Sequence, residues 1–289
     1  MTLTDPADIK ALLQRHGFRF SKAMGQNFLI NPSVCPRMAE ACGAAPGRGV
    51  LELGPGIGVL TEQLAMRAKK VVAVELDRRL LPVLAETLSA YPCVEIVEGD
   101  ILKLDLPRLL REKFGSLPVS VCANLPYYIT SPIVMTLLES RLPIDSLTVM
   151  VQKEAAQRLC ARPGTREAGA VTLAVQYYAV PEILFSVSRG SFLPAPHVDS
   201  AVIRLTLRKE PPCPVRDETV LFRAVRAAFG QRRKTLLNSL SSGGWSRDAV
   251  SVALDKAGIS PTARAEELTL ENFARLSENL PDPASMRPR

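Results

Sequence analysis

The sequence predicts a mostly parallel α/β sheet with helices on both faces, followed by a small helical domain. Three observations support this fold class. Between residues 49 and 161, apolar strand-like segments alternate with segments of helical periodicity, which is typical of a parallel sheet. Two later strand-like segments, 182–187 and 200–207, indicate an antiparallel edge. The proline-rich stretch 209–216 then precedes a purely helical pattern.

The predicted elements follow one another in a regular order. The strand-like segments are "GVLELG" (49–54), "VVAVEL" (71–76), "VEIVEGD" (94–100), "VSVCANL" (119–125) and "SLTVMVQ" (146–152). The helix-like segments between them are "GVLTEQLAMRA" (58–68), "RRLLPVLAETLSA" (78–90), "SPIVMTLLES" (131–140) and "KEAAQRLCA" (153–161). Ser131 is expected as an N-cap because a proline follows it at the first helical position. We therefore expect a larger domain over residues 1–209 and a small helical domain over 217–289.

The composition is typical of a folded protein without a membrane span. Hydrophobic residues make up 47% of the 289 residues, and the mean hydropathy is +0.10. The most apolar stretch, residues 170–185, is interrupted by Gln176, Pro181 and Glu182, so it is not expected to cross a bilayer. The polar start of the chain has no apolar core of a signal peptide, which favours a cytoplasmic location.

Cysteine and histidine usage argues against a metal site. The six cysteines form no C-x-x-C pair, and several lie inside apolar runs, so reduced and mostly buried thiols are expected. The two histidines, His16 and His197, are far apart in the sequence. A His-rich metal centre and a Ser-His-Asp triad are therefore disfavoured.

Basic residues are concentrated near the end of the chain. The formal net charge is +7, and residues 204–289 hold 15 of the 36 Lys and Arg but only 10 of the 29 Asp and Glu. Within them, the basic segment 223–234 has no acidic residue; its basic side chains are Arg223, Arg226, Arg232, Arg233 and Lys234. Such a run favours a polyanion such as nucleic acid, although a solvated basic helix is the alternative.

A glycine-rich turn follows the first strand of the sheet. In "ELGPGIG", Gly54, Gly56 and Gly58 precede a helix, where glycines let the backbone approach a ligand closely. Val59 takes the position of the last glycine in the dinucleotide fingerprint, which disfavours NAD, and the phosphate-binding loop of nucleotide hydrolases is absent. A tight strand-to-helix turn without a ligand is the alternative.

Two carboxylates end the next two strands. Glu75 lies 21 positions after Gly54 and can accept hydrogen bonds from both hydroxyls of a ribose. Asp100 ends the third strand and can accept from an adenine amino group. Each residue alone has a structural alternative, a surface position for Glu75 and a helix cap for Asp100. Because parallel strand ends share one crevice, the set favours S-adenosylmethionine as the ligand.

These segments resemble the class I S-adenosylmethionine-dependent methyltransferases, which have a Rossmann-like domain with a seven-stranded sheet. The resemblance rests on "ELGPGIG", "VELD" and "EGD". In addition, "GQNFLINP" (25–32) is similar to the N-terminal motif of one branch of that class. There the resemblance implies that Asn27 and Leu29 contact the cofactor.

The stretch "ANLPYYIT" (123–130) follows the fourth strand of the predicted parallel sheet. The resemblance implies that this strand end faces the transferred methyl group. An adenine amine is a poor nucleophile because its lone pair is conjugated with the ring. The side-chain oxygen of Asn124 and the carbonyl of Leu125 can accept hydrogen bonds from the two N–H groups of this amine. Such hydrogen bonds favour a tetrahedral nitrogen. Pro126 fixes the turn, and Tyr127 can stack on a flipped base. A proline turn with Tyr127 packed on the sheet is the alternative.

The motif N-L-P-Y resembles that of the ribosomal RNA adenine dimethyltransferases rather than that of the DNA amine methyltransferases, which have an acid at this position. "FLPAPHVDSAV" (192–202) is similar to a later motif of the same family. This similarity implies that Phe192 stacks on the base opposite Tyr127, although a loop aromatic filling the sheet edge is the alternative. Tyr128 has no implied role and is expected to pack.

The C-terminal segments "AFGQRRKTLLNSL" (228–240) and "RAEELTLENFARL" (264–276) are similar to the small-subunit (16S) branch, the KsgA type. This resemblance implies a monomer that dimethylates two adjacent adenines in the 3′-terminal hairpin loop of small-subunit rRNA during ribosome assembly. Residues 1–209 would bind the cofactor and catalyse, and residues 217–289 would bind rRNA. A large-subunit rRNA methyltransferase of the macrolide-resistance type and a non-catalytic assembly factor are the alternatives.

Overall fold

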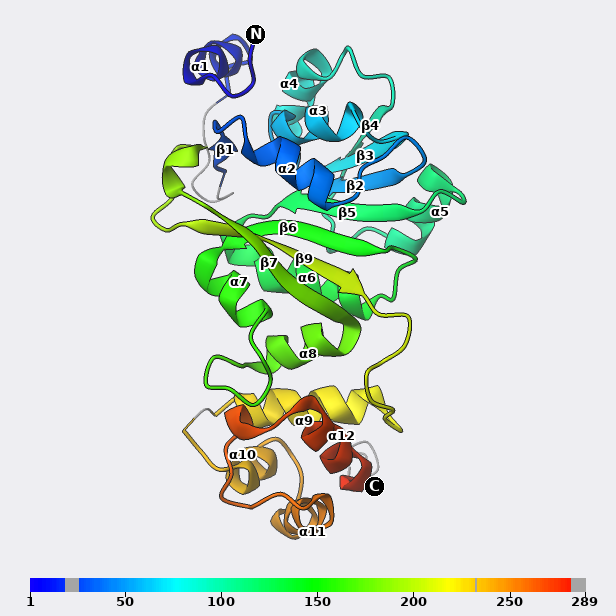
Figure 1. Cartoon of the computed structure of the whole chain (residues 1–289), viewed down its shortest axis with the longest axis vertical. Helices are drawn as coiled ribbons and strands as arrows, with labels where there is room; N and C mark the ends of the chain where they lie inside the picture. Colours follow the sequence, from blue (N-terminus) through cyan, green and yellow to red (C-terminus); the bar gives the residue numbers. More distant parts are fainter. Residues whose placement is uncertain (19–25, 232, 282–289) are drawn as a thin grey trace. The chain divides into compact units, whose positions relative to one another are not determined.

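Seven strands form one mixed sheet, as the apolar pattern predicts (Figure 1). In spatial order they are β4 (Val94–Glu98), β3 (Lys70–Glu75), β2 (Gly49–Leu53), β5 (Val119–Asn124), β6 (Ser146–Gln152), β9 (Ser200–Leu207) and β7 (Ala179–Val187). The first five are parallel to one another, and β9 is antiparallel to β6. The mostly parallel sheet with an antiparallel edge is therefore confirmed. All five residues of β2 are buried because helices cover both faces of the sheet.

The structure, a computed structural model, describes residues 1–18, 26–231 and 233–281. It contains two compact units: unit 1 consists of Met1–Ala156 and Val180–Leu207, and unit 2 of Gln157–Ala179 and Arg208–Arg289. Residues 157–179 thus cluster with the C-terminal helices, although they precede the proline-rich stretch that marks the expected domain boundary.

Unit 1 adds helices and a small second sheet to the strands. Its helices are α1 (Pro6–Arg15), α2 (Val34–Ala41), α3 (Val59–Ala65), α4 (Leu81–Thr87), α5 (Leu106–Phe114), α6 (Thr130–Glu139) and the first part of α7 (Lys153–Leu159). The second sheet pairs β1 (Phe28–Leu29) with β8 (Phe192–Leu193) in antiparallel fashion. Helices α2 and α6 lie on opposite sides of the large sheet (Figure 1). The sheet is therefore covered on both faces.

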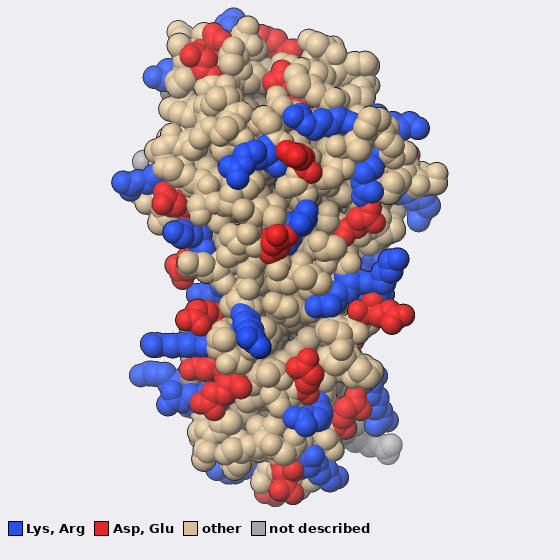
Figure 2. Space-filling view, in the orientation of Figure 1, with Lys and Arg blue, Asp and Glu red and all other residues tan. Residues whose placement is uncertain are grey.

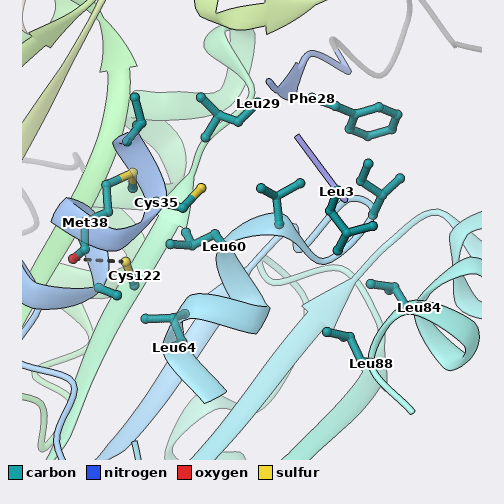
Figure 3. Packing of buried hydrophobic residues seen from close by; sticks show 14 of the residues in the cluster. Leu3, Phe28, Leu29, Cys35, Met38, Leu60, Leu64, Leu84, Leu88 and Cys122 are labelled. Carbon is teal, nitrogen blue, oxygen red and sulfur yellow. Dashed lines mark hydrogen bonds between the residues drawn. The ribbon is translucent and has the colours of Figure 1, made fainter. Parts of the chain in front are cut away.

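A hydrophobic cluster fills the space between α2, α3, α4 and one face of the sheet (Figure 3). Leu60 and Leu64 of α3 and Met38 of α2 are at most 4% exposed. The Cys122 thiol of β5 donates a 4.0 Å hydrogen bond to the carbonyl of Met38, and Cys35 lies beside them. All six cysteines are free thiols, as expected.

Unit 2 is helical. Its helices are α8 (Ala170–Tyr178), α9 (Glu218–Phe229), α10 (Leu236–Ser242), α11 (Arg247–Ala257) and α12 (Leu270–Asn279). Aromatic contacts join them, since the rings of Tyr177 and Phe222 meet edge to face at 5.3 Å and those of Phe229 and Phe273 stack at 6.0 Å. No helix among the described residues is long and apolar enough to cross a bilayer.

Candidate active site

A pocket opens at the carboxyl ends of the parallel strands in unit 1. This is where open α/β sheets bind ligands. Its wall is built from the ends of β2, β3 and β5, from the turn after β4, and from β1, which crosses over them. The residues that line it include Gln26, Asn27, Phe28, Leu29, Glu52, Gly54, Gly56, Glu75, Leu76, Asp100, Ile101, Asn124, Leu125, Pro126, Tyr127 and Tyr128.

The glycine turn between β2 and α3 shapes the floor of the pocket. Gly54, Gly56 and Gly58 have φ values of +67°, +62° and +94°, a region that favours glycine. Gly54 and Gly56 line the pocket, whereas Gly58 does not. A Cβ on Gly58 would lie 3.1 Å from the side chain of Leu88. The structure therefore gives Gly58 a packing role at the start of α3.

Glu75, the last residue of β3, is 6% exposed. Its carboxylate accepts the backbone N–H of Gly56 at 3.3 Å and that of Asp77 at 2.8 Å. Burial raises the pKa of Glu75, and these two amides partly offset the rise. A buried carboxylate that is held by backbone amides and faces a pocket can accept hydrogen bonds from a diol such as a ribose.

Asp100 lies in the turn after β4 and caps no helix, because the next helix, α5, has Asp105 as its N-cap. Its Oδ1 accepts the backbone N–H of Leu102 within the turn at 3.1 Å, and Oδ2 lies 3.6 Å from the ammonium group of exposed Lys103. The carboxylate also lines the pocket. The turn hydrogen bond occupies only one of its two oxygens.

Two apolar residues of the pocket were missed by the sequence analysis. Leu76 and Ile101 each directly follow a strand-end acid and line the pocket, and Leu76 is 50% exposed. Together they offer apolar surface to a planar ring whose polar groups are met by the neighbouring acids. An apolar residue next to each acid was the signal in the sequence.

The segment around β1 is held against the strand ends by three contacts. The side-chain amide of Asn124 donates to the carbonyl of Asn27 at 3.4 Å, and that of Gln26 donates to Asp77 at 2.8 Å. The Phe28 ring packs over Gly56, whose added Cβ would lie 3.2 Å from it. With its amide nitrogen turned toward Asn27, Asn124 keeps Oδ1 as the acceptor for an incoming amine.

The turn after β5 fixes the remaining groups of the motif. The backbone N–H of Leu125 donates to the carbonyl of Met150 at 3.1 Å. The Tyr127 hydroxyl lies 2.7 Å from the buried Ser200 hydroxyl, and burial raises the pKa of Tyr127. Tyr128 is 61% exposed and lines the pocket, so the expectation that it packs is wrong.

Comparison with known proteins decides the family. A family model described as Ribosomal RNA adenine dimethylase matches residues 17–282. The chain belongs to this family. The predicted class I fold and the prediction of an S-adenosylmethionine-dependent rRNA adenine dimethyltransferase are thereby confirmed. The buried acid on β3, the glycine turn and the apolar pair together offer hydrogen-bonding groups and apolar surface of the kind that a ribose and an adenine ring require.

Relatives of this dimethylase cover nearly its whole length. It is 51% identical to the ribosomal RNA small subunit methyltransferase A of Geobacillus thermodenitrificans, over 96% of this chain and 97% of that one. The protein of the same name from Anoxybacillus flavithermus is 50% identical, over 96% of each chain. Among solved structures, the 23S rRNA methyltransferase ErmE is 32% identical with a TM-score of 0.66, covering 88% of this chain and 99% of that one. A dimethyladenosine transferase from Plasmodium falciparum is 25% identical with a TM-score of 0.71, covering 86% and 95%.

Phe192 of this dimethylase is buried in the small second sheet. It is 3% exposed, pairs with Leu29 across the small sheet, and is not among the residues that line the pocket. In this arrangement its ring offers almost no surface to a base. The Phe192 side chain instead packs in the small sheet that β8 forms with β1. Stacking of Phe192 on the target base stays a prediction.

The basic segment of the dimethylase is divided between exposed and structural side chains. Arg226, Arg233 and Lys234 are exposed and form no salt bridge within the described ranges. Arg223 instead donates to the carbonyl of Gly243 at 3.4 Å, and its guanidinium lies 5.1 Å from the centre of the Trp245 ring. Arg223 therefore braces unit 2. Arg232 lies outside the described residues.

Charge elsewhere on the dimethylase is mixed. On the face shown in Figure 2, basic and acidic side chains are interspersed. The candidate RNA-binding side chains are therefore defined by their exposure and not by one large basic patch on that face.

Within the described part of the chain, no cluster of three or more His, Cys, Asp or Glu side chains could hold a metal ion.

Glu52, another residue that the sequence analysis missed, lies on the pocket wall. It is 1% exposed, and its Oε2 has no hydrogen-bond partner among the described residues. Burial raises its pKa to about 8, and the nearby Glu75 adds to the rise. Glu52 is therefore mostly protonated at neutral pH.

Proposed function

We propose that this dimethylase modifies the exocyclic amines of two adjacent adenines in the 3′-terminal hairpin loop of small-subunit rRNA. The observation that carries the choice of subunit is the identity of 50–51% to small-subunit enzymes over 96% of the chain. The large-subunit alternative is not favoured, because identity to the 23S enzyme is 32%. The substrate is an assembling small subunit in the cytoplasm, and the enzyme acts as a monomer.

The cofactor is held by residues of three strand ends and of β1. Glu75 would accept hydrogen bonds from the ribose hydroxyls and Asp100 from the adenine amine, and Leu76 and Ile101 would offer apolar contact to the adenine ring. Asn27, Leu29, Gly54 and Gly56 line the same pocket and hold the rest of the molecule. When bound, S-adenosylmethionine supplies an electrophilic methyl group. Gly58 acts by allowing α3 to start close to α4.

The transfer site is the turn after β5. The Oδ1 of Asn124 and the carbonyl of Leu125 accept hydrogen bonds from the N–H groups of the target amine, two before the first methylation and one before the second, which favours a tetrahedral nitrogen whose lone pair is not conjugated with the ring. Tyr127 stacks on the extruded base, and the Ser200 hydrogen bond holds its ring in place. Donors and acceptors placed in advance at a reacting centre contribute strongly to catalysis.

Transfer of tritiated methyl groups from the labelled cofactor tests this proposal. Small and large ribosomal subunits that lack the modification are incubated separately with the enzyme. We expect label in the rRNA of the small subunit and background counts in the large one. Label in the large subunit alone would overturn the choice of substrate.

A further inference from the structure

A dipeptide of unit 1, Asp199–Ser200, joins the transfer site to two exposed basic residues. The Ser200 hydroxyl holds the hydroxyl of Tyr127 at 2.7 Å. The backbone carbonyl of Asp199 accepts the N–H of Lys153 at 3.0 Å, and its side-chain Oδ1 accepts the N–H of Arg189 at 2.9 Å. Lys153 and Arg189 are therefore anchored through their backbones beside the stacking tyrosine.

The sheet places Lys153 on the same edge as Asn124. Strand β6 pairs with β5 so that Met150 lies opposite Asn124, and Lys153 follows three residues later. At about 3.3 Å per residue, the last two residues of β6 extend roughly 7 Å beyond the end of β5, and Lys153 directly follows them as the first residue of α7. A nucleotide whose base reaches the β5 turn thus has its backbone within reach of this side chain.

Both side chains keep their charge available. Lys153 is exposed, and its ammonium group has no hydrogen bond or ion pair among the described residues. Exposed Arg189 donates one bond, of 3.4 Å, to the carbonyl of His197. Glu154 directly follows Lys153 in the chain, Glu182 and Asp199 are the acids before and after Arg189, and one oxygen of Asp199 is already engaged by the Arg189 backbone.

Base extrusion creates the need for cations at this place. An extruded nucleotide rotates about its own backbone, so the phosphates on both sides must be held while the base enters the pocket. Phosphate contacts fix the register of a nucleic acid without reading its sequence. An ammonium group and a planar guanidinium suit this task, because both donate to phosphate oxygens.

We infer that Lys153 and Arg189 bind the backbone phosphates that flank the target adenine. This assignment rests on the proposed function. It adds a second RNA contact, located at the transfer site in unit 1, to the contact made by the basic segment of unit 2.

The variants Lys153→Gln, Arg189→Gln and their double variant test the assignment. Two matched controls lie away from the pocket rim: exposed Lys69→Gln, just before the start of β3, and exposed Arg111→Gln, in the last turn of α5. Fluorescence anisotropy measures binding of the labelled 3′-terminal hairpin over a salt series. Calorimetry measures cofactor affinity as a check of the pocket.

Each single variant is expected to bind the hairpin roughly threefold to tenfold more weakly, and to lower the slope of log K against log[salt] by about 0.7, the value for one single-strand phosphate. The double variant loses about twice that slope, and the controls and cofactor affinity stay at wild-type values. An unchanged affinity and slope in the double variant would overturn the assignment. This experiment measures binding, whereas the proposed function is tested by methyl transfer. A wild-type enzyme that is inactive on small subunits would therefore refute the proposed function but would not decide whether Lys153 and Arg189 bind phosphates.

Discussion

Two buried carboxyl groups on neighbouring strands show how local hydrogen bonds decide the charge of a residue. Glu75 on β3 accepts two backbone N–H groups, which favour its ionised form. Glu52 on β2 is buried more deeply than Glu75, and its Oε2 has no partner among the described residues. Desolvation is therefore better compensated at Glu75 than at Glu52. We interpret Glu75 as the carboxyl acceptor that backbone amides hold in the pocket, and Glu52 as a neutral acid in its wall.

Replacing Glu52 by Gln is expected to stabilise the cofactor-free protein increasingly as the pH rises from about 4.5 to about 8. In this window the wild-type unfolded chain has lost the Glu52 proton while the folded protein keeps it, so wild-type stability falls with pH. The difference grows by about 1.4 kcal/mol per pH unit and levels off above the folded pKa. Urea unfolding at pH 5 and pH 8 measures it.

A matched control for this prediction is Glu40→Gln on α2, since Glu40 is exposed. Its stability relative to wild type should not depend on pH over the same range. An equal stability difference for Glu52→Gln at pH 5 and pH 8 would contradict the neutral state of the buried acid.

Asn124→Ala is expected to lower the rate of methyl transfer by at least about 10²-fold, because it removes an acceptor from the reacting amine. Cofactor affinity should stay near the wild-type value. Single-turnover transfer and calorimetry measure the two quantities. Asn124→Asp keeps an acceptor and should retain more activity than the alanine variant. Full activity of Asn124→Ala would refute the role of its side chain.

At the scale of elements, the large sheet could be predicted because its parallel strands are buried on both faces and therefore read as continuous apolar runs. The small sheet could not be predicted, because β1 and β8 have only two residues each. Their pairing also joins residues that are far apart in the sequence, Phe28 and Leu193. The expected cap at Ser131 is wrong. A 3₁₀ turn over Tyr127–Ile129 leads into α6, which begins at Thr130, whose hydroxyl donates to the Pro126 carbonyl.

The same distinction applies to the site. Residues at strand ends could be placed from the sequence because parallel strands share one carboxyl edge. The positions of Tyr128, Phe192 and Arg223 depend on packing between distant segments, which periodicity does not reveal. Leu76 and Ile101 were missed because an apolar residue beside a strand end also suits the core.

Truncating Phe28 is expected to weaken cofactor binding through the small sheet. Phe28→Ala removes the ring that packs on Gly56 and loosens the neighbouring Asn27 and Leu29. The loss of a buried Phe costs about 3–5 kcal/mol of stability. Thermal unfolding with and without S-adenosylhomocysteine separates the two effects, because a weaker ligand gives a smaller shift in Tm.

The control for this prediction is Phe114→Ala. Phe114 is 5% exposed and packs on Gly49, at the opposite end of β2 from the pocket. It should lower the Tm similarly but keep the full ligand-induced shift. Equal shifts in both variants would contradict the role of Phe28 at the site.

At the scale of the whole molecule, the cofactor pocket belongs to unit 1 and the basic segment to unit 2. The basic segment 223–234 therefore belongs to a different compact unit from the pocket. This separation predicts that RNA affinity and cofactor affinity can be changed independently.

The triple variant Arg226→Gln, Arg233→Gln, Lys234→Gln should bind small-subunit rRNA more weakly and with a salt slope lower by about 2 to 3, one counterion per lost phosphate contact. Cofactor affinity should not change. Arg223→Gln should instead lower the stability of the protein, because it loses the contact with Trp245. Filter binding over a salt series measures the first effect and thermal unfolding the second. A normal salt slope in the triple variant would refute RNA binding by the segment.

The most direct test of the central claim is to map the methylated nucleotides on unmethylated small subunits after reaction with the wild-type enzyme. Mass spectrometry of the digested rRNA identifies both the position and the number of methyl groups. The proposed function predicts two adjacent methylated adenines in the 3′-terminal hairpin loop, each carrying two methyl groups on its exocyclic amine. Methylation at another site, or on a ring nitrogen, would contradict it.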